Sequence, residues 1–336
     1  MASLKTRRRQ ARERAGGSGR AVSLSQVEDA PFGESRAYLR RIGYPQGDDF
    51  SRPSSKARFP DGAHFRVEVP TVNSADSVAT LVRVVEEEAG VKINRIDQTQ
   101  GIMRFSDKEH QAYLDVGRER GIEIFFALGP RGTYDTGAQK MVNTVWGHAS
   151  ALRTRGMEQV VHAMEDMKRI TRMGGRGLLI SDEGMLILAQ RMRADGVIPP
   201  DVRLMASAHM GHNNPVSFRL LEELGADTIA TQRDLEMSML ASMRRAVRVP
   251  LHVHIDNPQA TGGFIRVYDA PEMIRICAPV YLKTGSSVLE RHGMTITDAL
   301  ALAMARQVAV SMETIRRHMP RAVQTARPAK DMAIPV

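Results

Sequence analysis

The stretch Leu251-His252-Val253-His254-Ile255-Asp256 shows the pattern on which the fold prediction depends. Its apolar residues alternate with polar ones, which is typical of a β-strand with one face against a hydrophobic layer. Short β-rich runs recur along the chain, and helical segments with apolar residues at spacings of three and four separate them. The eight expected strands are residues 65–69, 91–96, 122–128, 177–181, 203–209, 227–231, 250–255 and 280–283.

Signals for helix ends agree with this reading of the chain. Ser106 and Glu109 form a capping box ahead of a helix expected over 107–120, and Gly121 ends that helix. Strands that alternate with helices pair in parallel through right-handed crossovers. Eight such units in about 250 residues predict a (β/α)8 TIM barrel over residues 63–319. A doubly wound sheet is disfavoured because no G-x-G-x-x-G turn follows the first strand.

The formal charge of +9 is concentrated at the two ends of the 336-residue chain. Residues 1–25 carry a net charge of +6 and residues 316–336 carry +4, which leaves −1 for residues 26–315. We therefore expect residues 1–25 to be a basic disordered tail, 26–62 an irregular N-terminal extension and 320–336 a C-terminal tail. Because the body is not basic, nucleic acid is not an expected partner.

The composition excludes several classes of protein. Cys277 is the single cysteine, so this chain alone forms no internal disulfide, cysteine-only zinc site or iron–sulfur cluster. No run approaches the roughly 18 apolar residues of a membrane helix, and no apolar segment of a signal peptide follows the arginines at the N-terminus. We expect a soluble cytoplasmic protein without a membrane partner. The long last helix, about residues 298–319, closes the barrel or packs against a second subunit, and we expect a homo-oligomer.

The alternation within the strands also predicts a site. In a barrel of this kind the active site forms at the C-terminal ends of the strands. With residues 251, 253 and 255 packed under the helices, the polar residues between them face the lumen. On strand 203–209 the same argument turns Ala208 outward and His209 inward. Four strands should therefore bring together five polar side chains, namely Glu68, His209, His254, Asp256 and Lys283.

Two interpretations of this polar layer remain open. The residues either form an ion-pair network that fills the barrel, or they hold a divalent metal ion or act as acid and base. In the second case the catalytic candidates are Glu68, His254 and Lys283, with Lys283 as an electrostatic group or a Schiff-base amine. The candidate ligands for Mg, Mn or Zn are His209, His254, Asp256 and Asp182, although Asp182 is also a plausible helix N-cap.

The loops after the last two strands suggest an anion site. Barrel enzymes often bind phosphate with these loops, because glycine lets an anion approach the backbone N–H groups. The segment 129–155 after the third strand is long enough to be a lid. The expected substrate-binding residues are Arg131 in that segment, Gly262 and Gly263 after the seventh strand, and Thr284, Gly285 and Ser286 after the eighth.

Part of the chain, about residues 175–290, resembles a known family. The stretches that carry the likeness are His212-Asn213-Asn214-Pro215, Leu220 to Asp227, His254-Ile255-Asp256-Asn257-Pro258, Gly262-Gly263-Phe264-Ile265-Arg266 and Tyr281-Leu282-Lys283-Thr284-Gly285. They resemble barrel proteins of the collagenase-like peptidase family, whose mechanism is unassigned. The resemblance implies a barrel fold and a peptidase label. Some members hold an iron–sulfur cluster with several cysteines, and a chain with Cys277 alone departs from them.

The sequence therefore predicts a barrel enzyme of the collagenase-like peptidase type. We expect a metal-assisted or acid–base hydrolase or lyase that acts on a small anionic substrate, because a lumen narrowed by charged residues suits a small molecule. Three alternatives remain: an aldolase-like carbon–carbon lyase that uses Lys283, a true peptidase, and a non-catalytic RNA-binding barrel that uses the N-terminal arm.

Overall fold

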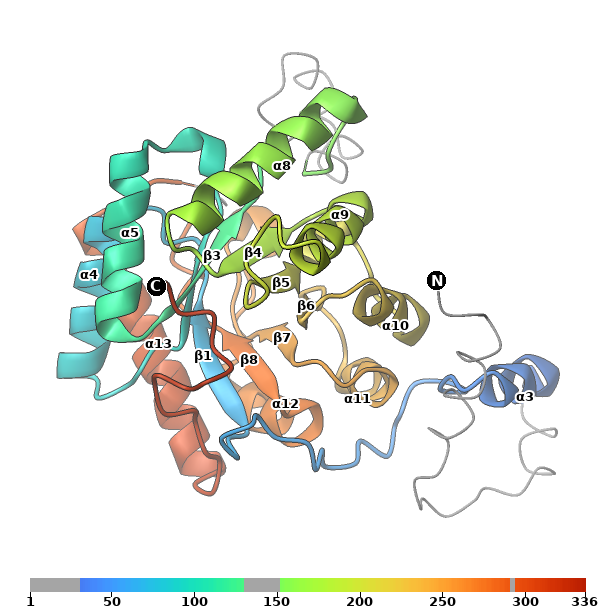
Figure 1. Cartoon of the computed structure of the whole chain (residues 1–336). Coiled ribbons are helices and arrows are strands. Elements are labelled where there is room, and N and C mark those ends of the chain that lie inside the picture. The colour runs from blue at the N-terminus through green and yellow to red at the C-terminus, as the bar shows by residue number, and fades with distance from the viewer. Residues whose placement is uncertain (1–30, 130–151, 291–293) are drawn as a thin grey trace.

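A computed structural model describes residues 31–129, 152–290 and 294–336. Eight parallel strands form a closed barrel in which each strand pairs with its neighbours in the sequence and β8 pairs with β1 (Figure 1). The (β/α)8 TIM barrel is therefore confirmed. The strands are β1 Phe65–Val69, β2 Arg95–Gln98, β3 Glu123–Ala127, β4 Gly177–Ile180, β5 Arg203–Ala206, β6 Thr228–Ala230, β7 Leu251–His254 and β8 Val280–Lys283.

Helices surround the barrel, and the sequence signals at their ends take the expected form. Ser106 and Glu109 make the reciprocal capping box of α5, and Gly121 ends that helix in a left-handed conformation with a φ of 63°. None of the described helices is long and apolar enough to cross a membrane. The helices are α3 Gly33–Arg41, α4 Ala75–Arg83, α5 Asp107–Arg120, α8 Gly156–Arg172, α9 Glu183–Ala194, α10 Pro215–Glu223, α11 Met237–Ala246, α12 Ala270–Cys277 and α13 Asp298–His318.

Two strands differ from the sequence prediction in ways that matter for the site. The sequence predicts the second strand over 91–96, but it starts only at Arg95. Val91 and Ile93 are buried, as in a strand, but they precede the paired segment. Asp97 therefore lies inside β2 and not at its end. The fifth strand ends at Ala206, since Ser207 accepts a hydrogen bond from the backbone N–H of His209 and starts a short 3-10 turn. Ala208, expected to face outward, consequently lines the pocket described below.

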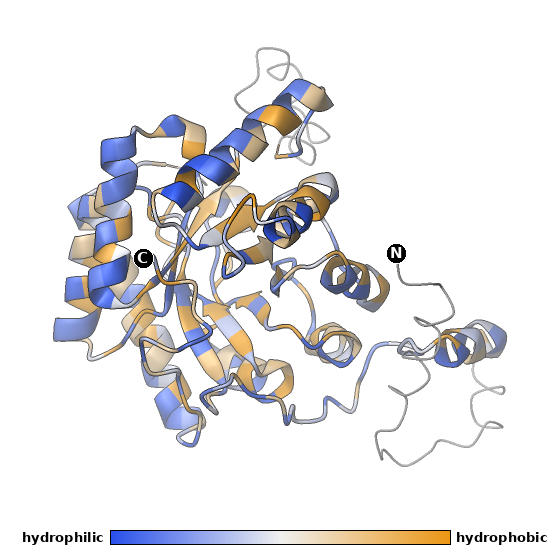
Figure 2. Cartoon of the chain, in the orientation of Figure 1, coloured by the Kyte–Doolittle hydropathy of each residue, from blue (hydrophilic) through white to orange (hydrophobic). Residues whose placement is uncertain are grey.

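The outward strand residues and the inner helix faces form one large apolar layer, while polar side chains cover the outside of the helices (Figure 2). The lumen is different because it contains buried charges. Arg95 forms two 3.0 Å contacts with the Glu123 carboxylate, and its guanidinium lies 3.8 Å from the ring centroids of both Phe125 and Tyr281. The Tyr281 hydroxyl donates to Glu123 at 2.9 Å. The buried charges of Arg95 and Glu123 thus balance each other, as an unpaired buried charge is costly.

The C-terminal segment after α13 packs against the N-terminal ends of the strands (Figure 1). Asp331 forms a 2.7 Å ion pair with the buried Arg66 of β1, and the backbone N–H of Ala333 donates to Glu123 at 2.9 Å. In the N-terminal extension, Phe59 packs edge-on against Tyr281 from the same side. These segments cover the end of the lumen opposite the candidate site.

Candidate active site

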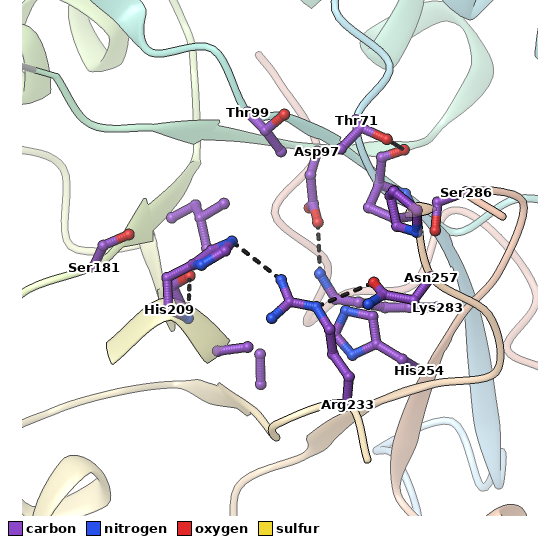
Figure 3. Close-up of a pocket in the computed structure, with 16 residues that line it drawn as sticks. Thr71, Asp97, Thr99, Ser181, His209, Arg233, His254, Asn257, Lys283 and Ser286 are labelled. Atoms are coloured by element: carbon purple, nitrogen blue, oxygen red, sulfur yellow. Dashed lines mark hydrogen bonds and ion pairs between the residues drawn. The ribbon is translucent and has the colours of Figure 1, made fainter. Parts of the chain in front are cut away.

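A pocket opens at the C-terminal ends of the strands and encloses about 540 Å³, counting the part that is open to solvent (Figure 3). Residues from most of the strand ends line it: Pro70, Thr71, Asp97, Thr99, Leu179, Ser181, Ser207, Ala208, His209, Ala230, Arg233, His254, Asn257, Pro258, Lys283 and Ser286.

Lys283 is the cation at the base of this pocket. Its Nζ lies 2.8 Å from Asp97 Oδ2 and forms a second ion pair with Glu68 Oε1 (Figure 3 shows the first contact). The three residues come from the adjacent strands β8, β2 and β1. Asp97 and Lys283 line the pocket, whereas Glu68 does not. Glu68 affects the pocket by its ion pair with Lys283 and by its effect on the pKa of Asp97. The expected convergence of Glu68 and Lys283 is present, with Asp97 as an additional member.

The pKa values of Asp97 and Lys283 are both raised, which favours the neutral form of Asp97 and the charged form of Lys283. Burial and the neighbouring Glu68 carboxyl raise the pKa of Asp97 to about 7, although Lys283 acts against the rise. Burial lowers the pKa of Lys283, but Asp97 and Glu68 outweigh it and the pKa is raised. Lys283 is therefore an ammonium ion at neutral pH, which disfavours the Schiff-base role. A carboxyl group with a pKa near 7 can both accept and donate a proton at that pH.

His252 lies below the cluster and fixes Glu68. Arg95 donates to His252 Nε2 at 3.1 Å, and an arginine can only donate, so Nε2 accepts. The proton of the neutral ring is then on Nδ1, which donates to Glu68 Oε2. Burial and the nearby Arg95 and Lys283 lower the pKa of His252 well below its ordinary value, in agreement with a neutral ring. Glu68 thus accepts from His252 and from Lys283 at the same time.

Arg233, just beyond β6, reaches across the opposite wall of the pocket. Its guanidinium donates to Asn257 Oδ1 and to His209 Nε2, each at 3.1 Å (Figure 3). No carboxylate of the described residues forms an ion pair with it, and burial lowers its pKa to about 10 despite Asp234 nearby. A cation with only neutral partners at a pocket wall is suited to binding an anion.

His254 is the second histidine of the pocket. Its Nδ1 is buried and has no hydrogen-bond partner among the described residues. Burial, followed by the charges of Arg233 and Lys283, lowers the pKa of His254 well below its ordinary value. The ring is therefore neutral at physiological pH, and its Nδ1 is available to a ligand in the pocket.

Asp256, which the sequence predicts as a metal ligand, does not join this cluster. Its carboxylate accepts five hydrogen bonds from the loop after β8, and it is fully buried. The N–H and hydroxyl groups of Thr284, Gly285 and Ser286, which the sequence predicts to bind substrate, donate to Asp256. Of these three, only Ser286 lines the pocket.

The remaining predicted residues have other surroundings. The N–H groups of Gly262 and Gly263 donate to Gln259 and Pro258 within their own turn, and neither glycine lines the pocket. Asp182 accepts from the N–H of Gly184 as the N-cap of α9 and also pairs with Arg153. Arg131 and most of the predicted lid lie outside the described residues.

The predicted metal ligands are not gathered into a metal site. Asp256 and Asp182 are engaged elsewhere, and His209 Nε2 faces the Arg233 guanidinium. In the part of the chain that the structure describes, no group of three or more His, Cys, Asp or Glu side chains is arranged to hold a metal ion. The donor set present therefore does not fit the expected divalent ion.

Three pocket residues were missed or undervalued in the sequence. Asp97 lies just after the strand expected over 91–96, whose expected end is two residues before the observed end at Gln98. Arg233 follows β6 directly, and its position at a strand end was the available signal. The role of Asn257 depends on its contact with Arg233, and no pattern along the chain predicts that contact.

No family model matches the sequence, and no curated protein matches it. The barrel is similar to solved structures at low identity. The YdjI aldolase from Escherichia coli K12 is 14% identical with a TM-score of 0.43, over 76% of this chain and 90% of that chain. The U32 peptidase Mk0906 is 14% identical with a TM-score of 0.38, over 62% and 74%. A structure described as native KDPGal is 10% identical with a TM-score of 0.43, over 79% and 98%. These values assign neither a family nor an activity to this chain.

Proposed function

We propose that this barrel is an enzyme that performs acid–base chemistry on a small anionic substrate. Asp97 transfers the proton and Arg233 binds the anionic group. The observation that carries the proposal is that a carboxyl group with a pKa of about 7 shares a small pocket with a guanidinium that has only neutral partners. Titratable groups perturbed in this way are typical of catalytic sites.

A carbon–carbon lyase uses each of these groups. The Asp97 carboxylate takes the proton of a substrate hydroxyl, and the carbon–carbon bond beside that hydroxyl breaks to leave a carbonyl. Its electron pair moves toward a second carbonyl and gives an enolate, whose oxygen the Lys283 ammonium stabilises. The enolate carbon then takes a proton from Asp97, which returns to the carboxylate. Lys283 keeps its proton throughout, in agreement with its raised pKa.

The other candidate functions have less support. A peptidase needs a groove that accommodates a polypeptide, whereas this pocket is confined to the ends of the strands inside the barrel. The RNA-binding alternative depends on residues 1–25, which lie outside the described residues. A divalent metal ion has no part in the proposed chemistry, because three of the four expected ligands, namely Asp182, His209 and Asp256, are engaged in other contacts.

The test is a retro-aldol assay with a panel of small hydroxy-oxo acids, in which the released carbonyl product is measured. The assay is run with the wild type, with Asp97→Asn, and with Asp166→Asn as the matched control. Asp166 is also a buried acid with a raised pKa, about 6, but it does not line the pocket. We expect turnover by the wild type and the control, and a loss on the order of 100-fold or more in Asp97→Asn.

Adding a chelator should leave this turnover unchanged, and a requirement for Mg, Mn or Zn would contradict the metal-free mechanism. Turnover that survives Asp97→Asn would reject Asp97 as the acid–base group.

A further inference from the structure

The loop after β8 surrounds the carboxylate of Asp256 with donors. Thr284 Oγ1 and the N–H of Gly285 donate to Oδ2 at 2.7 and 2.8 Å. The N–H groups of Ser286 and Ser287 donate to Oδ1 at 2.7 and 2.8 Å, and Ser286 Oγ adds a contact of 3.1 Å. Both oxygens of one fully buried carboxylate are thereby satisfied by one short loop.

This arrangement has the form of an anion-binding nest. Three consecutive backbone N–H groups converge on one negative group, as they do around bound phosphate. The convergence depends on Gly285, whose φ of 98° is a backbone conformation that other residues rarely adopt. In barrel enzymes the loop after the eighth strand is one of the two that commonly bind phosphate. Here the loop has that donor geometry, and the chain's own carboxylate fills it.

The charge of Asp256 is balanced in the way that this loop would balance a bound phosphate. No lysine or arginine of the described residues forms an ion pair with Asp256, so its charge is balanced by backbone and hydroxyl dipoles alone. A second anion at the loop would find its N–H groups occupied and would meet a like charge. Of the two cations among the described pocket residues, Lys283 already pairs with Asp97 and Glu68, which leaves the Arg233 guanidinium to receive an anion.

We infer that Asp256 is an internal substitute for phosphate, which excludes phosphorylated groups from the β8 loop and restricts the substrate to a carboxylate held by Arg233. The second half of this inference rests on the proposed function. Arg233 has a planar fork of donors that matches a carboxylate. It donates to Asn257 and lies near neutral His254, and neither residue adds a positive charge for a phosphate dianion.

The test is the response of protein stability to inorganic phosphate. Thermal unfolding is measured with the wild type and with Asp256→Ala over a series of phosphate concentrations at constant ionic strength. We expect no saturable phosphate effect in the wild type. Asp256→Ala should have a lower Tm than the wild type and recover about 2–4 °C as phosphate occupies the vacated loop.

A matched control separates this effect from general anion stabilisation. Glu222 also accepts two backbone N–H groups, from Arg248 and Val249, but it lies outside the pocket. Glu222→Ala should lose stability without gaining a phosphate response. An equal response in both alanine variants, or a saturable response in the wild type, would overturn the inference about the loop.

A second variant and a second ligand keep the test decisive if Asp256→Ala does not fold. Asp256→Asn fills the same volume, but its amide NH2 faces N–H donors, so the variant should be less stable than the wild type. Because the loop stays filled, its Tm should not respond to phosphate. A phosphate response of this variant would reject the inference that the side chain at 256 blocks the loop. The second ligand test uses the wild type. Small oxo acids should raise its Tm in a saturable way, and Arg233→Gln should abolish this increase. Phosphate monoesters should not raise the Tm of the wild type. Stabilisation by phosphate monoesters would reject the carboxylate restriction. The phosphate response needs no turnover, so it can fail or succeed independently of the proposed function.

Discussion

Lys283 Nζ lies 2.8 Å from Asp97 Oδ2, although 186 positions separate the two residues in the sequence. They meet because β8 and β2 both pair with β1, whose Glu68 is in register with Lys283 on one side and with Arg95 on the other. Closure of the barrel thus brings an amine and two carboxyl groups into one buried cluster. Its protonation determines both the proposed chemistry and part of the stability.

Asp97 should control the pH dependence of activity. Because its pKa is raised to about 7, a reaction that needs the carboxylate as a base should speed up as the pH rises through about 7 and then level off. Steady-state rates measured across that range on the wild type check this expectation. Asp97→Asn should remove the ascending limb together with the activity, while a limb centred near pH 4 in the wild type would contradict the raised pKa.

Lys283→Met should destabilise the fold in a pH-dependent way. The variant leaves the buried Asp97 and Glu68 carboxyl groups without their cation, which costs about 3–5 kcal/mol of unfolding free energy. Loss of Lys283 removes the group that lowers the pKa of Asp97, so the folded variant favours protonated Asp97 more strongly. Its stability should therefore fall as the pH rises through about 7. Denaturant unfolding at acidic and alkaline pH measures this, and adding Asp97→Asn should recover part of the loss.

Arg233→Gln should separate stability from binding. The buried guanidinium is an uncompensated charge, so its replacement by a neutral amide should leave the Tm unchanged or raise it. The affinity for a carboxylate ligand should fall on the order of 100-fold, because a charge-assisted bidentate contact is lost. Thermal unfolding and isothermal titration test the two halves separately. A variant that unfolds more easily yet binds normally would show that Arg233 is a structural residue.

Asp331→Ala should weaken the barrel from its other end. Arg66, which is 1% exposed, loses its ion-pair partner and keeps its contacts with Thr325 and Tyr281, the Phe59 ring and the more distant Glu123 charge. We expect a loss of about 2 kcal/mol in denaturant unfolding. Adding Arg66→Met to this variant should restore part of the loss, because the unpaired charge is then gone. Unchanged stability would mean that the C-terminal segment does not close the lumen in solution.

The strand alternation predicted the side-chain directions well where the strand ends were right. The parity of Leu251 to His254 directed His252 and His254 inward, and both have lumen contacts. It failed where irregular backbone intervened. A 3-10 turn begins at Ala208, so its side chain lines the pocket. The second strand was predicted to end before Asp97, whereas Asp97 lies within β2.

Asp256 shows a different reason for failure. Its inward direction could be read from the sequence, but its partner could not. Whether a buried carboxylate binds a metal ion or a backbone loop depends on which donors lie within about 3 Å, and those donors come from the loop after β8. A pattern along one strand carries no information on that distance.

The sequence by itself determined the barrel, its eight repeating units and the sides to which most strand residues point, because these depend on local periodicity and on burial of apolar surface. Only the tertiary structure decided which charges neutralise one another. Lys283 pairs with Asp97 and Glu68, Asp256 with the loop after β8, and Arg233 with no carboxylate of the described residues. Electrostatic interactions depend on distances across the barrel, and those are fixed by the closure and register of all eight strands together.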